Sequence, residues 1–417
     1  MNAFAGPADF VQAAEPLCGK TIAEQVRGLP LRARFVLKRL VHMRRGSLVV
    51  ATPEGRVFRI EGAEPGPAAA VRLANWNLPR RALAGGTVGV AESYIDGDWE
   101  SPDVAVFLQL FLANADLAAD MGGRAGGVVR LVSRLRHWLN ANTRAGSRKN
   151  IAAHYDLGNA FYEQWLDSTM SYSAALYSNG ANDLASAQHA KYRALATAMG
   201  IEPGDHVLEI GCGWGGFAEY AAREIGCRVT GLTISREQHD FARARLAEAG
   251  LGERTEIAFR DYRDETGRYD HVVSIEMFEA VGEKYWSTYF DRVRRCLKPG
   301  GKAGLQVITI NDAAFERYRS NPDFIQRYVF PGGMLPTMRH LRDVAARSEL
   351  NLTAEHAFGG DYARTLVEWR DRFWRAWSTI RPLGFDERFR RMWEFYLQYC
   401  EAGFRARHID VRQVVYE

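Results

Sequence analysis

The chain of 417 residues is 47% hydrophobic and 25% charged, so it carries enough apolar side chains for more than one compact core. Its 54 Lys and Arg residues against 50 Asp and Glu residues give a formal net charge of +4, which excludes a protein that binds nucleic acid by overall charge alone. The five cysteines form no CxxC pair, which disfavours a disulfide framework and a structural zinc site. We expect two domains, no metal and a reducing compartment.

Two segments of the N-terminal third are basic and contain no Asp or Glu, namely residues 28–53 and residues 122–150. In the first, Leu31, Phe35 and Leu40 recur at helical spacing, which predicts a basic amphipathic helix. In the second, residues 128–139 show the same periodicity. Such helices bind anionic lipid, with about 1 kcal/mol from each Lys or Arg near the surface. The alternative is the solvated face of a helix packed on its own domain.

Between these segments the pattern is that of a small α+β domain, predicted to span residues 1–140. Residues 47–62 alternate around a Pro-Glu-Gly turn and predict a hairpin. Short strands are expected near residues 70–73 and 87–94, and a helix over residues 104–117. The polar, Gly- and Ser-containing stretch 140–149 is the predicted domain boundary.

Residues 141–417 are predicted to form the second and larger domain, in which strand and helix signals alternate as in a doubly wound α/β sheet. Pro299, Gly300 and Gly301 predict the end of the helix before the last of the expected strands. Those strands cover residues 206–210, 228–232, 255–260, 271–275 and 303–310.

A glycine-rich turn follows the first of these strands and precedes a helical pattern, in the run HVLEIGCGWGGF at residues 206–217. Glycines there let backbone N–H groups approach a ligand at the carboxyl end of a strand. The spacing differs from the G-x-G-x-x-G of dinucleotide-binding turns, which favours a cofactor without a pyrophosphate. Glu209, at the end of the strand, suits a cationic amine.

The E-I-G-C-G-W-G run resembles the first motif of class I S-adenosylmethionine-dependent methyltransferases, and six further motifs narrow the resemblance. Together they are similar to the cyclopropane-fatty-acyl-phospholipid synthase family, and ESYIDGDWE at residues 92–100 is similar to its small N-terminal lipid-associated domain. The resemblance implies a Rossmann-like α/β domain with a mostly parallel seven-stranded sheet. The six motifs are HYDLGNAFYEQWLDSTMSYS (154–173), VTGLTISREQ (229–238), RDYRD (260–264), MFEAVG (277–282), YVFPGGMLP (328–336) and FRARHIDVRQVV (404–415).

The resemblance also implies S-adenosylmethionine as cofactor and the residues that bind it. Thr233 and Gln238 have an alternative role, because Ser235 and Gln238 form the Ser-x-x-Gln pattern of a helix capping box. The implied contacts are Tyr172 and Ser173 closing over the cofactor, Glu209, Gly211 and Gly213 at its amino-acid end, Thr233 and Gln238 near the ribose and methionine side, and Asp261 and Tyr262 beside the adenine.

In this family a methyl group is transferred to a cis double bond of an acyl chain, and a base, thought to be a bound bicarbonate, removes a proton to close the ring. The positions implied to hold that anion include Glu279, Tyr362 and the backbone of Ile308. Two others depart from the family, since Ala174 replaces a Cys and Gln306 replaces a His. Gln306 cannot accept a proton near neutral pH, so we expect Glu279 to act as the base or to orient the anion. The alternative for Glu279 is a buried structural pair with an arginine.

The C-terminal region is rich in aromatic residues where the family's acyl tunnel is expected. Most of them are expected to form core, and a few to stabilise a cation through their ring faces. Cys400 aligns with a family cysteine once regarded as nucleophilic, although a lone cysteine is usually a small buried hydrophobe. The aromatic residues are Trp369, Phe373, Trp374, Trp377, Phe385, Phe389, Trp393, Phe395, Tyr396 and Tyr399.

The leading hypothesis is therefore a methyltransferase that uses S-adenosylmethionine to modify the double bond of unsaturated acyl chains in phospholipids. The departures at Ala174 and Gln306 favour an alternative, methylation without ring closure, which gives methyl-branched, methylene or furan-precursor chains. A lipid-binding protein with a degraded site is an alternative from another class. No stretch reaches the roughly 18 apolar residues of a membrane span, and residues 1–10 lack a secretory signal pattern. We expect a cytoplasmic homodimer at the inner face of an anionic membrane, with no nucleic-acid partner.

Overall fold

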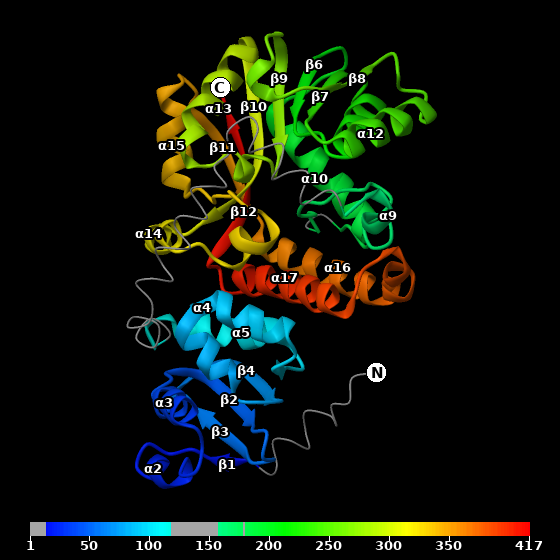
Figure 1. Ribbon diagram of the computed structural model, residues 1–417. Helices are drawn as coiled ribbons and strands as arrows, with labels where there is room; N and C mark the ends of the chain where they lie inside the picture. The colour runs from blue at the N-terminus through cyan, green and yellow to red at the C-terminus, as the bar shows by residue number, and fades with distance from the viewer. Residues whose placement is uncertain (1–13, 118–156, 178–179) are drawn as a thin grey trace. The chain divides into compact units, whose positions relative to one another are not determined.

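The computed structural model describes residues 14–117, 157–177 and 180–417, with the elements labelled in Figure 1. The chain divides into two compact units, Met1–Ser133 with Phe385–Ala406, and Arg134–Gly384 with Arg407–Glu417. The chain thus returns to the first unit for one late helix. The division at residue 140 stays a prediction. The predicted basic helix at residues 128–139 and the predicted boundary at residues 140–149 lie outside the described residues.

The first unit is built on a five-stranded sheet in the order β1-β3-β2-β4-β5 (Figure 1). The predicted hairpin is confirmed, because β2 and β3 pair antiparallel with Leu48 opposite Ile60 and Val50 opposite Phe58. Helix α5 packs on β4 and β2, and α17 packs on α4 and α5. The elements are β1 (Glu15–Pro16), α2 (Ile22–Gln25), α3 (Leu31–Leu40), β2 (Arg45–Ala51), β3 (Val57–Glu61), β4 (Glu64–Leu73), α4 (Asn77–Ile95), β5 (Trp99–Glu100), α5 (Val104–Ala113) and α17 (Glu387–Arg405).

Two details of this unit differ from the sequence predictions. Residues 87–94 form the second part of α4 and not a strand: after a kink at Gly86, Val88, Ala91 and Ile95 are buried at helical spacing. Helix α3 is present, but its buried face consists of Ala33, Leu37 and Leu40.

The predicted apolar face of α3 is wrong at two of its three positions. Leu31 is 78% exposed and Phe35 is 43% exposed, while only Leu40 is buried. The helix therefore presents two large apolar side chains beside its basic residues, on the side that does not pack against the unit.

The second unit contains a seven-stranded sheet in the order β11-β12-β10-β9-β6-β7-β8, and the predicted α/β class is confirmed (Figure 1). Strands β10, β9, β6, β7 and β8 run parallel, while β12 runs antiparallel to both β10 and β11. Strand β6 has the predicted bounds. The strands are β6 (His206–Ile210), β7 (Arg228–Thr233), β8 (Thr255–Phe259), β9 (Tyr269–Ile275), β10 (Leu297–Ile310), β11 (Leu352–Ala357) and β12 (Ile409–Tyr416).

The helix before β10 ends earlier than predicted. Helix α13 stops at Cys296 and β10 begins at Leu297, so Pro299, Gly300 and Gly301 lie within the strand. The pairing of β10 with β9 shifts register between Leu297 and Lys302, which accommodates the proline and the glycines as an irregularity in the strand.

Helices cover both faces of this sheet. The main ones are α9 (Asn159–Tyr162), α10 (Leu184–Met199), α11 (Gly216–Tyr220), α12 (Arg236–Glu248), α13 (Trp286–Cys296), α14 (Asp312–Ser320), α15 (Met338–Arg347) and α16 (Gly359–Ile380). Short turns of other helix types are η1 (Ala221–Ile225), η2 (Tyr262–Asp264), η3 (Phe278–Ala280), η4 (Glu283–Tyr285), η5 (Ile325–Val329) and η6 (Arg381–Leu383). Among the described residues, no helix has the length and apolar character needed to cross a membrane.

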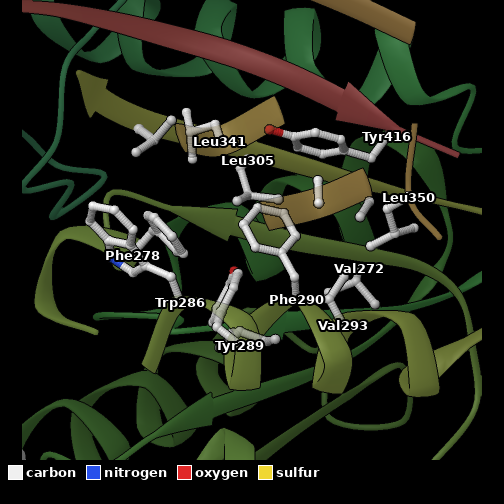
Figure 2. Packing of buried hydrophobic residues seen from close by; sticks show 14 of the residues in the cluster. Val272, Phe278, Trp286, Tyr289, Phe290, Val293, Leu305, Leu341, Leu350 and Tyr416 are labelled. Carbon is white, nitrogen blue, oxygen red and sulfur yellow. The ribbon is translucent and has the colours of Figure 1, made fainter. Parts of the chain in front are cut away.

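Alternate residues of the central strands supply two separate cores. Val207 and Val273 pack with α10, α11 and α12, whereas Leu208 and Val272 pack with α13 and α15. Figure 2 shows the second core, in which the rings of Trp286, Tyr289 and Phe290 gather beneath the sheet.

The second core anchors the segment that follows β9. The ring centroid of Phe278 lies 5.7 Å from that of Trp286 and 5.0 Å from that of Tyr289. Phe278 is buried between them, so η3 is held against the core and the side chain of its central residue, Glu279, has a defined position.

Candidate active site

The predicted glycine-rich turn connects β6 to α11 at the carboxyl edge of the parallel strands. Gly211 has φ +84°, and a Cβ there would lie 2.7 Å from a side-chain carbon of Met277, so only glycine fits. Gly213 has φ +53°, and nothing lies within 4 Å of the position a Cβ would take. The turn therefore leaves space beside its backbone at Gly213, as a loop that approaches a ligand requires.

Glu209 lies at the end of β6 and is only 3% exposed. Burial raises the pKa of its carboxyl to about 8, against the opposing effect of the Lys191 charge and of a hydrogen bond from the backbone of Ala218. Its Oε2 atom has no hydrogen-bond partner among the described residues. A buried acceptor of this kind fits a cationic donor from a ligand, such as the amino group of an amino acid.

Lys191 was not singled out from the sequence, yet it is fully buried on α10. Its Nζ donates to Ser173 Oγ, and Gln188 Nε2 donates to the Ser173 carbonyl at 3.0 Å. Burial lowers the pKa of the Lys191 ammonium to about 8, while Glu276, Asp167 and Glu209 act to raise it. Lys191 thus holds the predicted cofactor residue Ser173 and is the shared cation of the surrounding carboxylates. A lysine among apolar residues at the core-facing spacing of a helix was the available sequence signal.

Thr233 and Gln238 are both buried beside the start of α12. Ser235 accepts a hydrogen bond from the Gln238 N–H at 3.4 Å, as the capping alternative predicts. The Gln238 side chain does not complete the reciprocal capping box, because its Oε1 accepts from the Thr233 hydroxyl at 3.0 Å. Gln238 therefore takes part in the helix cap through its backbone N–H and pairs with Thr233, at the end of β7, through its side chain.

Asp261 and Tyr262 follow β8 at the same edge of the sheet. Both carboxylate oxygens of Asp261 accept from the Arg263 guanidinium, at 2.9 Å from Nε and 2.6 Å from a terminal nitrogen. The ring of Tyr262 lies 5.4 Å from that of Tyr289, and burial raises the pKa of its hydroxyl to about 12. The two residues are rigidly placed beside the end of β8.

Glu279 and Ile308 meet as the sequence predicts. The backbone N–H of Ile308 donates to Glu279 Oε1 at 2.6 Å, whereas Oε2 has no partner among the described residues. Burial raises the pKa of Glu279 to about 8, and repulsion from Glu276 acts in the same direction. The alternative of a structural pair with an arginine finds no support in these contacts, because the partner is a backbone amide.

Gln306 and Tyr362 also converge, but on a residue that the sequence interpretation missed. Tyr362 donates to Glu276 Oε2 at 2.7 Å, and Gln306 Nε2 donates to Glu276 Oε1 at 2.8 Å. The N–H of Ala174 donates to the same Oε1 at 2.8 Å. Glu276 directly follows β9 and precedes the Met277–Gly282 motif by one residue. A carboxylate next to a strand end, three residues before a second one, was the signal that could have identified it.

Aromatic rings surround the Tyr362 side of this cluster. The ring of Trp369 lies 6.1 Å from Tyr362, 5.2 Å from Tyr172 and 5.7 Å from Trp165. Trp369 and Trp165 are fully buried. One of the aromatic residues predicted to line an acyl tunnel is therefore next to the carboxylate cluster, while Trp393, Phe395 and Tyr396 are buried on α17 in the first unit. Cys400 also lies on α17, and its role in the chemistry stays a prediction.

The profile of the mycolic acid cyclopropane synthetase family matches residues 142–414. The chain belongs to this family. It is 39% identical over 355 residues to the tuberculostearic acid methyltransferase UfaA1 of Mycobacterium tuberculosis, covering 81% of this chain and 80% of that protein. It is 38% identical over 360 residues to the cyclopropane-fatty-acyl-phospholipid synthase of Escherichia coli, covering 86% and 89%.

A solved structure shows the same family. The mycolic acid cyclopropane synthase CmaA1, complexed with SAH and CTAB, matches with a TM-score of 0.61 at 27% identity, covering 64% of this chain and 97% of that chain. The predicted family, fold and enzyme class are thereby confirmed, and this member is a methyltransferase that depends on S-adenosylmethionine.

Proposed function

We propose that this family member transfers a methyl group from S-adenosylmethionine to a carbon of a double bond in an acyl chain of a phospholipid. The observation that carries the proposal is the pair of half-buried glutamates, Glu276 and Glu279, at the same sheet edge as the glycine-rich turn. Glu276 accepts a hydrogen bond from Tyr362, whose ring lies beside that of Trp369. An alkene is a weak nucleophile, and its methylation needs a water-free site with a base. The pair of glutamates and the rings supply both.

In this proposal the cofactor lies along the carboxyl edge of β6, β7 and β8. Its amino group binds the open oxygen of Glu209, its ribose faces Thr233 and Gln238, and its adenine lies beside Asp261 and Tyr262. When bound, S-adenosylmethionine supplies an electrophilic methyl group. Tyr172, packed on Trp369 and Trp165, closes the site from the side of residues 157–177.

The aromatic residues have a defined task in the proposed reaction. Methylation of an alkene leaves a cation on the neighbouring carbon, and ring faces stabilise such a charge by about 0.5–2 kcal/mol or more when water is excluded. The ring of Trp369 lies 5.2 Å from that of Tyr172 and 6.1 Å from that of Tyr362, and the Tyr362 hydroxyl donates to the Glu276 carboxylate. We therefore propose that the acyl double bond binds between these rings and the carboxylate.

Two products are compatible with this site. Loss of a proton from the transferred methyl group onto the base closes a cyclopropane, and the departures at Ala174 and Gln306 favour methylation without ring closure. The two reported relatives are almost equally similar, and one is named a methyltransferase while the other is named a cyclopropane synthase. We propose the double-bond methylation as the common step and leave the product to the experiment.

Incubation with labelled S-adenosylmethionine and defined unsaturated phospholipids tests the proposal. Label in the released acyl chains supports it, and absence of label from every unsaturated lipid would refute it. A cyclopropane and a methylene chain have the same mass, so mass spectrometry alone cannot separate them. Proton NMR of the acyl esters, or mild hydrogenation before mass analysis, distinguishes a ring from a residual double bond.

We also propose that α3 places the first unit on an anionic membrane. Its exposed Leu31 and Phe35 stand beside Arg32, Arg34 and Arg39, and the guanidinium carbon of Arg39 lies 5.6 Å from the Phe35 ring centroid. Apolar side chains within a basic, acid-free segment match the requirements for interfacial binding. The predicted location at the inner face of the membrane rests on this helix.

Sedimentation with vesicles tests the role of α3. The double variant Leu31→Ser, Phe35→Ser should lose most of its binding to anionic vesicles while keeping methyl transfer on detergent-dispersed phospholipid. Substitution of Leu383, another exposed apolar residue that is 47% exposed, provides a matched control that should bind normally. Equal binding of all three proteins would contradict the proposal. The predicted homodimer is a separate proposal that light scattering can test.

A further inference from the structure

The carboxylate of Glu276 occupies the place where the sequence resemblance implies a bound bicarbonate. The N–H of Ala174, the Gln306 amide and the Tyr362 hydroxyl, all at positions implied to hold that anion, donate to Glu276 instead. These donors come from three segments far apart in the chain and leave none of the three for a separate ion. The residues present therefore do not fit a bicarbonate site.

The backbone at Glu276 shows that this placement is imposed by the fold. Its φ is +49°, in the left-handed region that a residue with a side chain rarely adopts. Its N–H donates to the Gln306 carbonyl at 2.7 Å, which holds the residue against β10 in this conformation. A strained backbone at the end of a strand persists when the surrounding structure requires it, and such positions cluster at active sites.

The electrostatic surroundings of Glu276 differ from those of its neighbour Glu279. Burial raises the pKa of Glu276, while Lys191 and the donors from Gln306, Tyr362 and Ala174 act to lower it. Among the described residues Glu279 is stabilised by backbone N–H groups only, while burial and repulsion from Glu276 raise its pKa to about 8. A pKa of about 8 favours a protonated Glu279 near neutral pH, whereas Lys191 and three hydrogen bonds stabilise the charged form of Glu276. Two carboxyl groups in such different surroundings take different roles.

We propose that Glu276 is the proton acceptor of the reaction, a base built into the chain in place of a bound anion. The inference rests on the proposed function. The π electron pair of the alkene forms the new C–C bond, and the bond between methyl and sulfur breaks with its electron pair on sulfur. For ring closure, a C–H bond of the transferred methyl group then breaks and its electron pair forms the third ring bond to the cationic carbon. For an alkene product, a C–H bond on a carbon adjacent to the cation breaks and its electron pair forms the new double bond. In both cases the proton passes to Glu276 Oε2. Three hydrogen bonds leave this carboxylate one acceptor position for that proton.

Three proteins test the proposal in buffer freed of carbon dioxide: the wild type, Glu276→Gln and Glu276→Gly. The wild type should be as active without bicarbonate as with it. Glu276→Gln keeps the size of the side chain but cannot accept a proton, so its methyl transfer should fall about 100-fold or more. Binding of S-adenosylhomocysteine, measured by calorimetry, should stay within about twofold in both variants and show that they are folded.

Glu276→Gly carries the decisive measurement, because it removes the carboxylate and leaves the three donors. Its activity should be low in bicarbonate-free buffer and should rise at least tenfold when bicarbonate or formate is added. Rescue by a small anion is not expected of a residue with a structural role only. Glu349→Gly is the matched control, since Glu349 is an exposed glutamate with φ +58° outside the site, and its activity should be normal and independent of bicarbonate.

The outcomes separate this inference from the proposed function. Wild-type activity that falls at least tenfold without bicarbonate would overturn the inference and leave the proposed function standing, as would undiminished activity of Glu276→Gln. A Glu276→Gly variant that no small carboxylate rescues would also overturn it. If the wild type labels no unsaturated phospholipid under any condition, the proposed function fails and the inference fails with it.

Discussion

Glu209 and Glu276 occupy comparable places and differ in one decisive respect. Each lies at the carboxyl end of one of two neighbouring parallel strands, β6 and β9, and each is influenced by the charge of Lys191. Glu209 keeps an oxygen without a partner among the described residues, whereas Glu276 receives hydrogen bonds from three protein donors. A buried carboxylate with an unpaired oxygen, which we call open, needs a ligand to supply a hydrogen bond. A carboxylate whose two oxygens already accept hydrogen bonds from the protein, which we call closed, does not. The same side chain therefore serves binding at one strand end and, by our proposal, chemistry at the next.

The strongest test of the difference between Glu209 and Glu276 is to remove the charge of the open carboxylate, Glu209. Glu209→Gln should weaken S-adenosylhomocysteine binding about 100-fold, because a hydrogen bond to a charged group contributes about 1.5–3 kcal/mol. Glu276→Gln should leave that affinity within about twofold. Calorimetric titration of the two variants side by side measures the contrast, and equal losses of affinity would contradict the division between binding and chemistry.

Removing the shared cation should affect both carboxylates. With Lys191→Met, the charge that lowers the pKa of Glu209 and Glu276 is lost, so both pKa values rise. Because the proposed base must be ionised, activity near pH 7 should fall by about 10-fold or more and the acid limb of the pH–rate profile should move to higher pH. The groups facing Glu276 are Lys191 from α10, Gln306 from β10, Tyr362 from α16 and Glu279 from η3.

The alkaline limb of the same profile provides a second readout. Lys191 has a pKa of about 8, so the wild type loses this charge as the pH rises through 8. The activity of the wild type should decline there, and Lys191→Met should lack that transition. Lys284→Met, at an exposed lysine of the same unit, is the control and should keep the wild-type profile. A variant profile that superimposes on the wild type would refute the shared role of Lys191.

Removing one of the three hydrogen bonds to the Glu276 carboxylate should reduce activity less than the substitutions above. Tyr362→Phe removes the hydrogen bond to Glu276 Oε2 and leaves the ring beside Trp369 in place. We expect kcat to fall about 10-fold with little change in KM, since the base is less well positioned while the substrate is still bound. Steady-state kinetics on one unsaturated phospholipid measures the effect, and a change confined to KM would assign Tyr362 to substrate binding instead.

The smallest predicted effect is a proton linkage at Glu209. Its pKa of about 8 means that the carboxyl is mostly protonated at pH 7 before the ligand binds. An ammonium group that binds there favours the ionised form, so up to about one proton should be released and affinity should rise between pH 6 and pH 8. Calorimetry of S-adenosylhomocysteine binding in buffers of different ionisation enthalpy measures this release. Identical heats in all buffers would show that Glu209 does not contact the amino group.

Local patterns in the sequence were sufficient for much of the fold and for part of the site. The apolar run before the glycines predicted β6 with the bounds it has, and the alternation on either side of the Pro-Glu-Gly turn predicted the β2–β3 hairpin. Residues 87–94 were misread because a kink at Gly86 disguises the helical spacing of α4. Leu31 and Phe35 were misread because the burial of α3 depends on which face the rest of the unit covers.

What the sequence by itself determined was the family and the cofactor class, and it predicted that Glu279, Tyr362 and Gln306 belong to one site. The family and the cofactor class follow from motifs whose members lie within a few residues of one another. Only the tertiary structure decided which group these residues bind. It brings hydrogen-bond donors from Ala174, Gln306 and Tyr362 onto the carboxylate of Glu276, although Ala174 and Tyr362 lie 188 positions apart in the sequence. The physical reason is that buried polar groups must find partners, and which partners are within reach depends on strands and helices that pack together only in the folded chain.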